Sequence, residues 1–210
     1  MTRTSQCLLV IVALLPVLAG ASDWREAFQN DWVVEKSGGA QIRDDGDGVT
    51  GIVPYGDQLV WRSRTASTGA VEAELSLQAK VSTPLRVNAI PVAISVDGSH
   101  YLHLHGNTYV SHGSRLYGDR NYNDGRGDVA TVSAIPADAE WHTYRIQTSG
   151  GGVRSWIDDH PVHDEPWPFG NASWFWRILL IGDHPETVTM SLRNVRLGAV
   201  PGSAGTGNGQ

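Results

Sequence analysis

Trp141-His-Thr-Tyr-Arg-Ile-Gln147 and, after a glycine turn, Val153-Arg-Ser-Trp-Ile-Asp-Asp-His-Pro-Val162 decide the fold of this chain. Apolar and polar side chains alternate in both runs, as they do in a β-strand that buries one face. The glycines between the runs and the Asp-Asp pair after the second are residues that tight turns favour. The stretch therefore predicts a strand, a turn, a second strand and a tight turn.

Short runs of the same kind occur along most of the chain. They are Gln58–Arg62, Val71–Gln78, Ile90–Val96, Tyr101–His105, Val129–Ser133, Trp176–Ile181 and Val188–Leu192. Gly, Asp, Asn and Pro separate these runs, and only Trp24–Asn30 has a helical pattern, which is short. Strands of this length and spacing predict an all-β fold, an antiparallel sandwich or barrel.

The stretch from Trp141 to Val162 resembles the hairpin W-H-x-Y-R-I … V-x-x-x-I-D-G-x-x-V of concanavalin A-like lectin/glucanase domains. Asp159 stands where that pattern has glycine, and aspartate tolerates the left-handed conformation of such turns. Val92–Leu104 resembles the central hairpin of these domains, and Ser191–Leu197 resembles their closing strand. The resemblance implies a two-sheet antiparallel jelly-roll sandwich with a carbohydrate partner.

Two groups of this fold offer models for an enzyme. The size and strand pattern are similar to those of the 3-keto-disaccharide hydrolase domains, although the Asn-Ser-Gly stretch of that group is missing from Val87–Val96. Jelly-roll polysaccharide lyases, with His, Tyr and Arg in the cleft, are the second model. The Glu-x-Asp-x-x-Glu strand motif of jelly-roll glucanases is absent from the sequence, which counts against that hydrolase family.

The N-terminus has the pattern of an export signal. A positively charged start, an apolar run from Cys7 to Leu18 and a small-x-small pattern ending at Ala21 predict a signal peptide over residues 1–21. The apolar run is too short to span a bilayer. An uncleaved N-terminal anchor is the alternative. The mature protein is therefore expected to be periplasmic or extracellular, in a bacterium.

Residues 22–200 are expected to form one domain that is held by its core, because the only cysteine, Cys7, precedes them. Residues 201–210 are rich in Gly, Ser and Asn and are expected to be disordered. The net charge is −6 at pH 7, which argues against nucleic acid and anionic membrane surfaces as partners. No segment after the signal is apolar enough to cross a membrane.

The run Tyr101-Leu-His-Leu-His105 is the sharpest candidate for chemistry. If its leucines face the core, Tyr101, His103 and His105 share the other face, which we expect to line a cleft. Adjacent His and Tyr side chains can act as general acid and base on a glycan. Two histidines at this spacing can instead chelate a metal with a third ligand from the following loop. A polar strand face without chemistry is the third alternative.

Substrate-binding residues are expected in the polar loop from His112 to Asp128 and on neighbouring elements. Long loops beside a rigid sheet often carry specificity, although a plain solvated connection is the alternative. Amide, guanidinium and aromatic groups bind sugars, and arginine also pairs with a uronate carboxylate. The candidates are Arg115, Tyr117, Asp119, Arg120 and Asn121 in the loop, Arg86 and Asn88 before a central strand, and Trp61 and Trp176 as stacking platforms, whereas Trp141 and Trp156 are expected in the core.

These observations predict a secreted or periplasmic carbohydrate-active protein. A glycan-cleaving enzyme of the glycoside hydrolase or polysaccharide lyase type, with a His/Tyr-lined cleft, is the first hypothesis. A non-catalytic, lectin-like carbohydrate-binding domain that uses the same face is the alternative. No cofactor is required for either. Asp44–Gly48 offers oxygen ligands suited to calcium, so a structural calcium ion or another divalent metal is an option beside a plain turn.

Overall fold

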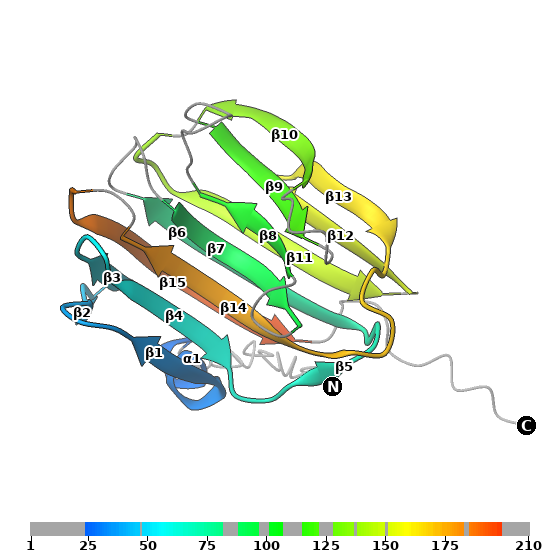
Figure 1. Ribbon diagram of the computed structural model, residues 1–210, viewed down its shortest axis with the longest axis horizontal. Coiled ribbons are helices and arrows are strands. Elements are labelled where there is room, and N and C mark those ends of the chain that lie inside the picture. The colour runs from blue at the N-terminus through cyan, green and yellow to red at the C-terminus, as the bar shows by residue number, and fades with distance from the viewer. Residues whose placement is uncertain are drawn as a thin grey trace, which may run out of the picture.

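The computed structural model consists of two antiparallel β-sheets stacked face to face, the front sheet and the back sheet of Figure 1. It describes residues 24–46, 48–81, 88–96, 101–106, 115–121, 128–136, 138–149, 151–182 and 185–198. The all-β, two-sheet sandwich predicted from the sequence is confirmed. Within the described part of the chain, no helix has the length and apolarity needed to span a membrane.

The strand order in both sheets departs from the order in the chain, so the chain crosses repeatedly between the sheets. The front sheet contains, in spatial order, β1 (Trp32–Lys36), β4 (Gln58–Ser63), β14 (Ser173–Ile181), β7 (Asn88–Ser95), β8 (Tyr101–His105), β9 (Arg115–Asn121) and β10 (Asp128–Pro136), with β5 (Ser67–Thr68) paired to β14. The back sheet contains β13 (His160–Pro166), β12 (Gly152–Ile157), β11 (His142–Ser149), β6 (Ala73–Val81), β15 (Val188–Gly198), β3 (Val49–Val53) and β2 (Gln41–Asp44). The helix α1 (Trp24–Asp31) precedes β1 and confirms the short helical pattern at the start of the domain.

The core lies between the sheets and follows from the alternation of side chains along each strand. In β14, Trp174, Trp176, Ile178 and Leu180 are buried, whereas the residues between them are partly or fully exposed. Strand β6 shows the same alternation from the back sheet. Because successive side chains point to opposite faces, each front-sheet strand also presents an outer set of side chains, turned away from the core.

The hairpins predicted from the sequence are confirmed. Strand β11 pairs with β12 across the glycine turn, and β7 pairs with β8 with Val92 opposite Leu104. The turn between β12 and β13 has φ values of 47° at Asp158 and 63° at Asp159. A two-residue hairpin turn of type I′ requires positive φ at both central residues. Aspartate therefore takes the position that glycine has in the related pattern.

The polar segment predicted as a loop contains a strand, so that prediction was wrong. Arg115–Asn121 forms β9 and pairs with β8 on one side and β10 on the other. A β-carbon at Gly118 would lie 2.4 Å from Val162 Cγ1 and 2.5 Å from His163 Cε1, so β13 approaches this strand closely. Backbone pairing and this close approach hold the strand in place. Neither requires alternating apolar side chains, so the sequence pattern did not reveal this strand.

Trp61 and Trp176, predicted as stacking platforms, lie in the core. They are 1% and 2% exposed and belong to the buried cluster between the sheets. Their strands place them on the inner face, where no ligand can stack on the rings from outside. The prediction of a stacking surface at these two positions is therefore corrected.

Trp141 and Trp156, predicted in the core, are instead partly exposed. The guanidinium carbon of Arg193 lies 4.1 Å from the ring centroid of Trp141, and that of Arg145 lies 4.1 Å from the centroid of Trp156. These are cation–π contacts. The inner face of β12 carries smaller side chains, which leaves Trp156 on the outer face of the back sheet.

Candidate functional site

His103 and His105 form a close pair on the outer face of the front sheet. Leu102 and Leu104 lie in the core, so the two histidines of β8 face away from it, as predicted. Their Nε2 atoms are 3.2 Å apart, and both residues are nearly buried, at 6% and 4% exposure. An imidazole nitrogen either donates or accepts a hydrogen bond. One histidine of a neutral pair therefore holds a proton that the other accepts.

The strand register extends this pair into a row across the sheet. Strand β7 places Ala93 opposite His103, and β14 places Arg177 opposite Ala93. Strand β4 then places Arg62 opposite Arg177. Neighbouring strands lie about 4.8 Å apart, so roughly 10 Å separates the backbones of Arg177 and His103. Ala93 contributes only a methyl group, and no long side chain of this row comes between them.

Arg62 and Arg177 face one carboxylate, that of Glu35. Arg62 Nε donates a hydrogen bond to Glu35 Oε1 at 2.9 Å, and its guanidinium carbon lies 4.6 Å from the ring centroid of Phe175. Arg177 Nη2 is 4.0 Å from Glu35 Oε2, which is too far for a hydrogen bond. Arg177 Nε is buried and has no hydrogen-bond partner among the described residues. Among the described residues, this end of the row therefore has two guanidinium groups beside one carboxylate, and one donor, Arg177 Nε, without a partner.

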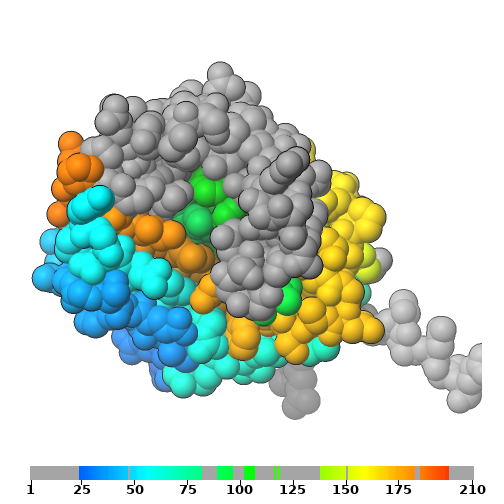
Figure 2. Space-filling model, in the orientation of Figure 1, coloured from blue at the N-terminus to red at the C-terminus, as the bar shows by residue number. Residues whose placement is uncertain are grey.

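The front sheet is hollowed over these strands. Figure 2 shows a depression with green atoms of the β7 and β8 region at its floor and orange atoms of β14 beside them. The row from His103 to Arg177 crosses these same three strands. We refer to this depression, together with the row on the same three strands, as the front hollow.

Most of the other predicted site residues are placed by their backbone alone. Asp119 is the register partner of His103, Tyr117 that of His105, and Asn121 that of Tyr101. The residues whose side chains lie outside the described part are Tyr101, Asn88, Arg115, Tyr117, Asp119, Arg120 and Asn121. Arg86 lies outside the described residues altogether. The roles assigned to all of these residues stay predictions.

The sequence reasoning missed Arg62 and Arg177. Each of them directly follows a buried tryptophan inside a strand that has strands on both sides. Charged side chains are rare in such surroundings unless they are paired or functional. That signal, a cation within an apolar strand, could have identified both residues before the structure was known.

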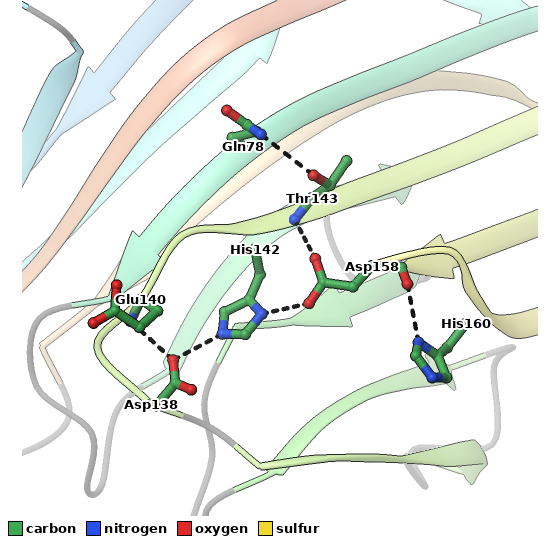
Figure 3. A network of polar contacts seen from close by, with 7 residues as sticks. All are labelled: Gln78, Asp138, Glu140, His142, Thr143, Asp158 and His160. Carbon is green, nitrogen blue, oxygen red and sulfur yellow. Dashed lines mark hydrogen bonds and ion pairs between the residues drawn. The ribbon is translucent and has the colours of Figure 1, made fainter.

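A second polar network surrounds His142, at the end of the back sheet (Figure 3). His142 Nδ1 is 2.5 Å from Asp158 Oδ2, and its Nε2 is 3.0 Å from Asp138 Oδ1. Carboxylates only accept hydrogen bonds, so both ring nitrogens carry protons when both bonds form. Asp158 Oδ1 also accepts a bond from the backbone N–H of Thr143 at 2.8 Å. The network thus fastens the β12–β13 turn to the start of β11.

The charge on His142 is supported by its surroundings. Burial lowers the pKa of His142, but the hydrogen bonds and charges of Asp158 and Asp138 together outweigh burial and raise the pKa above 6.5. The pKa of Asp138 is lowered by the backbone N–H of Glu140 and by His142. The imidazolium is a structural clamp, because His142 is nearly buried and its two nitrogens are occupied by carboxylates.

His142→Gln is expected to lower the free energy of unfolding by about 1.5–3 kcal/mol at pH 6, the usual contribution of hydrogen bonds to charged groups. Because the pKa of folded His142 lies above that of the unfolded chain, this stabilisation is complete below about pH 6.5 and is lost as the pH rises through the folded pKa. Urea denaturation of both proteins from pH 6 to 9 measures the difference. A difference that does not shrink with rising pH contradicts the charged clamp, and the exposed His160→Gln serves as the control.

Ser155 and His163 form a further pair that is inaccessible. Ser155 Oγ is 2.5 Å from His163 Nδ1, but the two residues are 0% and 3% exposed. Ser155 Oγ also accepts a bond from the backbone N–H of His163 at 3.1 Å. The pair therefore joins β12 to β13 inside the sandwich, where no substrate reaches it.

The acidic turn near the start of the domain uses its carboxylates internally. Asp45 accepts hydrogen bonds from Arg43 and Thr50, and Asp44 Oδ1 accepts one from the backbone N–H of Gly46 at 2.9 Å. In the described part of the chain, no three His, Cys, Asp or Glu side chains are grouped to hold a metal ion. A structural calcium ion stays an untested prediction.

Comparisons with known proteins reveal the fold alone. No protein-family model and no curated protein sequence matches the chain. A mixed linkage glucan GH16 protein of Bacteroides ovatus has a TM-score of 0.56 at 11% identity, over 81% of this chain and 95% of that one. The PL7 alginate lyase AlyA1 of Zobellia galactanivorans has a TM-score of 0.55 at 10% identity, over 78% and 82%. The carbohydrate binding module CBM66 of Bacillus subtilis has a TM-score of 0.51 at 12% identity, over 80% and 96%.

Identities this low show a common architecture and leave the activity to be argued from the site. The finer resemblance to the 3-keto-disaccharide hydrolases stays a prediction, since no family model matches. The two antiparallel sheets, their crossovers and these structural neighbours agree with the resemblance read from the hairpin. The chain has an all-β, two-sheet jelly-roll fold.

Proposed function

We propose that this protein is an exported, glycan-cleaving enzyme that binds an oligo- or polysaccharide in the front hollow. The observation that carries the proposal is the pair of nearly buried histidines on the outer face of the front sheet, with Nε2 atoms 3.2 Å apart. Proteins of the same fold include a GH16 protein, an alginate lyase and a carbohydrate binding module, which supports a carbohydrate as the partner. Export rests on the N-terminal signal pattern, and N-terminal sequencing of the mature protein checks it.

The histidine pair has the chemistry of a general acid and base. One imidazole can take a proton from the substrate or from water as general base, and the pair, once protonated, can give that proton to the leaving glycosidic oxygen as general acid. Water is largely excluded from a nearly buried pair, which strengthens electrostatic interactions there. Tyr101, which begins the same strand, is proposed as a third member of the set.

A panel of glycans tests the proposal. Neutral, uronate and 3-keto sugars are offered to the purified protein, and both binding and the appearance of new reducing ends or unsaturated products are measured. Cleavage of at least one glycan is the expected result, and the type of product separates hydrolysis from elimination. Absence of both binding and cleavage across the panel would falsify the proposal.

The alternative function is a lectin-like domain without catalysis. It needs only a polar surface, and the partly exposed Arg62, Arg177 and Glu35 beside the hollow could provide one. Binding in the panel without any turnover, unchanged by substitution of His103, would establish this alternative in place of the enzyme.

The histidine pair also has a geometry that suits a divalent metal. Zn–N distances of about 2.0–2.1 Å place two imidazole ligands of a tetrahedral ion roughly 3.3 Å apart, close to the 3.2 Å observed between the Nε2 atoms. In this second candidate function, His103 and His105 would hold an ion, which would supply a Lewis acid to lower the pKa of water. We expect metal analysis of protein purified without chelators to decide between the two: one equivalent of zinc, lost in the His103→Ala variant, supports the metal, and metal-free active protein excludes it.

A further inference from the structure

We infer that the front hollow selects a glycan that carries a carboxylate, and that Arg177 is the residue that binds this group. The inference rests on the proposed function, since it names the substrate class for the same site. It starts from the row of side chains on the outer face of β14, β7 and β8, in which Arg177, Ala93 and His103 are register partners.

Arg177 is a half-buried cation, and one of its donors, Nε, has no hydrogen-bond partner among the described residues. The side chain is 18% exposed, its Nε is buried without a hydrogen-bond partner among the described residues, and its nearest carboxylate oxygen is 4.0 Å from Nη2. A buried donor without a partner costs about 1–3 kcal/mol. A native protein tolerates this arrangement where a ligand supplies the missing acceptor.

Glu35 does not neutralise this charge. Its carboxylate is bound by Arg62 at 2.9 Å and is itself 46% exposed, whereas Arg177 lies beyond hydrogen-bond distance of it. Arg62 is held further by Phe175, which lies under its guanidinium group. Among the described residues, two guanidinium groups therefore face one carboxylate, and Arg177 is the one on the side of the row nearer the histidines.

The chemistry of the guanidinium group favours a carboxylate as the ligand. Its planar fork donates two parallel hydrogen bonds that match the two oxygens of a carboxylate. Arg177 is separated from His103 by two strand spacings, roughly 10 Å at the backbone. Both side chains lie on the outer face of the front sheet in one row, so a sugar whose carboxylate binds Arg177 would have a neighbouring bond near the histidine pair.

The test compares matched ligands and matched variants. Oligogalacturonate, oligoalginate and hyaluronan tetrasaccharides are each titrated beside their carboxyl-reduced, neutral counterparts and a sulfated galactan oligosaccharide. We expect at least one uronate to bind about tenfold or more tightly than its neutral counterpart, and Arg177→Gln to weaken that uronate by about 10- to 100-fold while leaving the neutral sugar unchanged. Arg154→Gln, which removes an exposed arginine of the back sheet paired with Asp164, is the control and has no effect.

The outcomes separate this inference from the proposed function. Neutral glycans that bind and are cleaved as well as uronates, or uronate binding that survives Arg177→Gln, would overturn the inference and leave the proposed function standing. Equal binding of the sulfated oligosaccharide would overturn the carboxylate assignment. Binding of no glycan would overturn both. Arg177→Lys keeps the charge and loses the fork, so weaker uronate binding with unchanged binding of the neutral sugar in this variant supports the inference even if Arg177→Gln fails to fold.

Discussion

His103→Gln is expected to lower the rate of glycan cleavage by about 10²- to 10⁴-fold, the usual contribution of a general acid or base. The His103 and His105 Nε2 atoms share one hydrogen bond at 3.2 Å, so either substitution removes the proton relay of the pair. His105→Gln should therefore have a similar effect. The double variant should be little worse than either single one, because residues that act as a unit have non-additive effects. Initial rates on the glycan identified by the panel measure all three variants.

His160→Gln is the matched control for these substitutions. His160 is an exposed histidine at the start of β13 in the back sheet, and its Nδ1 lies 2.9 Å from the backbone oxygen of Asp158. The His160→Gln substitution should leave the cleavage rate unchanged. Thermal melting of each variant separates lost chemistry from lost folding. Multiplicative effects of the two site substitutions would contradict a shared proton and favour separate roles.

Trp61→Ala is expected to destabilise the fold by about 3–5 kcal/mol, the range for removing a large aromatic side chain from a core. Trp61 is 1% exposed, and its ring centroid lies 6.2 Å from that of Phe28. A β-carbon at Gly51 would lie 2.7 Å from Trp61 Cη2, so the ring packs directly against the backbone of β3 and leaves no room for a side chain there. Urea denaturation gives the free energy of unfolding.

Trp156→Ala is the matched control for the core substitution. Trp156 is partly exposed and stacks on Arg145 at 4.1 Å, and such a contact contributes about 0.5–1 kcal/mol at the surface. A small effect of Trp61→Ala on stability together with a large effect on sugar binding would restore the stacking-platform interpretation and contradict the core position.

The histidine face of β8 could be predicted because the residues between the histidines allow only one assignment of the two strand faces. Leu102 and Leu104 are both fully apolar and alternate with histidine, so the period of two assigns the faces without any knowledge of the partner strands. The tryptophans could not be assigned in this way. Strands β4 and β12 place a tryptophan where both faces carry apolar or small side chains, and alternation alone does not say which face is inside.

The first strands of the domain and the strands β9 and β13 could not be predicted from the alternation of apolar and polar side chains. Strand β2 is exposed along its whole length, and β9 is polar around Gly118. Their backbones are held by hydrogen bonds to the paired strands β3 and β8, and no apolar alternation in the sequence marks these pairings. Pairing of this kind depends on which strands the fold brings together, and a single sequence does not carry that information.

The sequence by itself determined the all-β class, the hairpins around Trp141–Val162 and Val92–Leu104, and the shared face of His103 and His105. Each of these follows from contacts between residues close in the chain, through side-chain period and turn chemistry. The tertiary structure alone decided that Arg62 and Arg177 lie in the same row as those histidines. Residue 177 comes next to residue 93, and residue 93 next to residue 103, only through the register of β14 on β7 and of β7 on β8. The candidate anion site is therefore a property of strand order, because crossovers between two sheets set neighbours that the chain order does not.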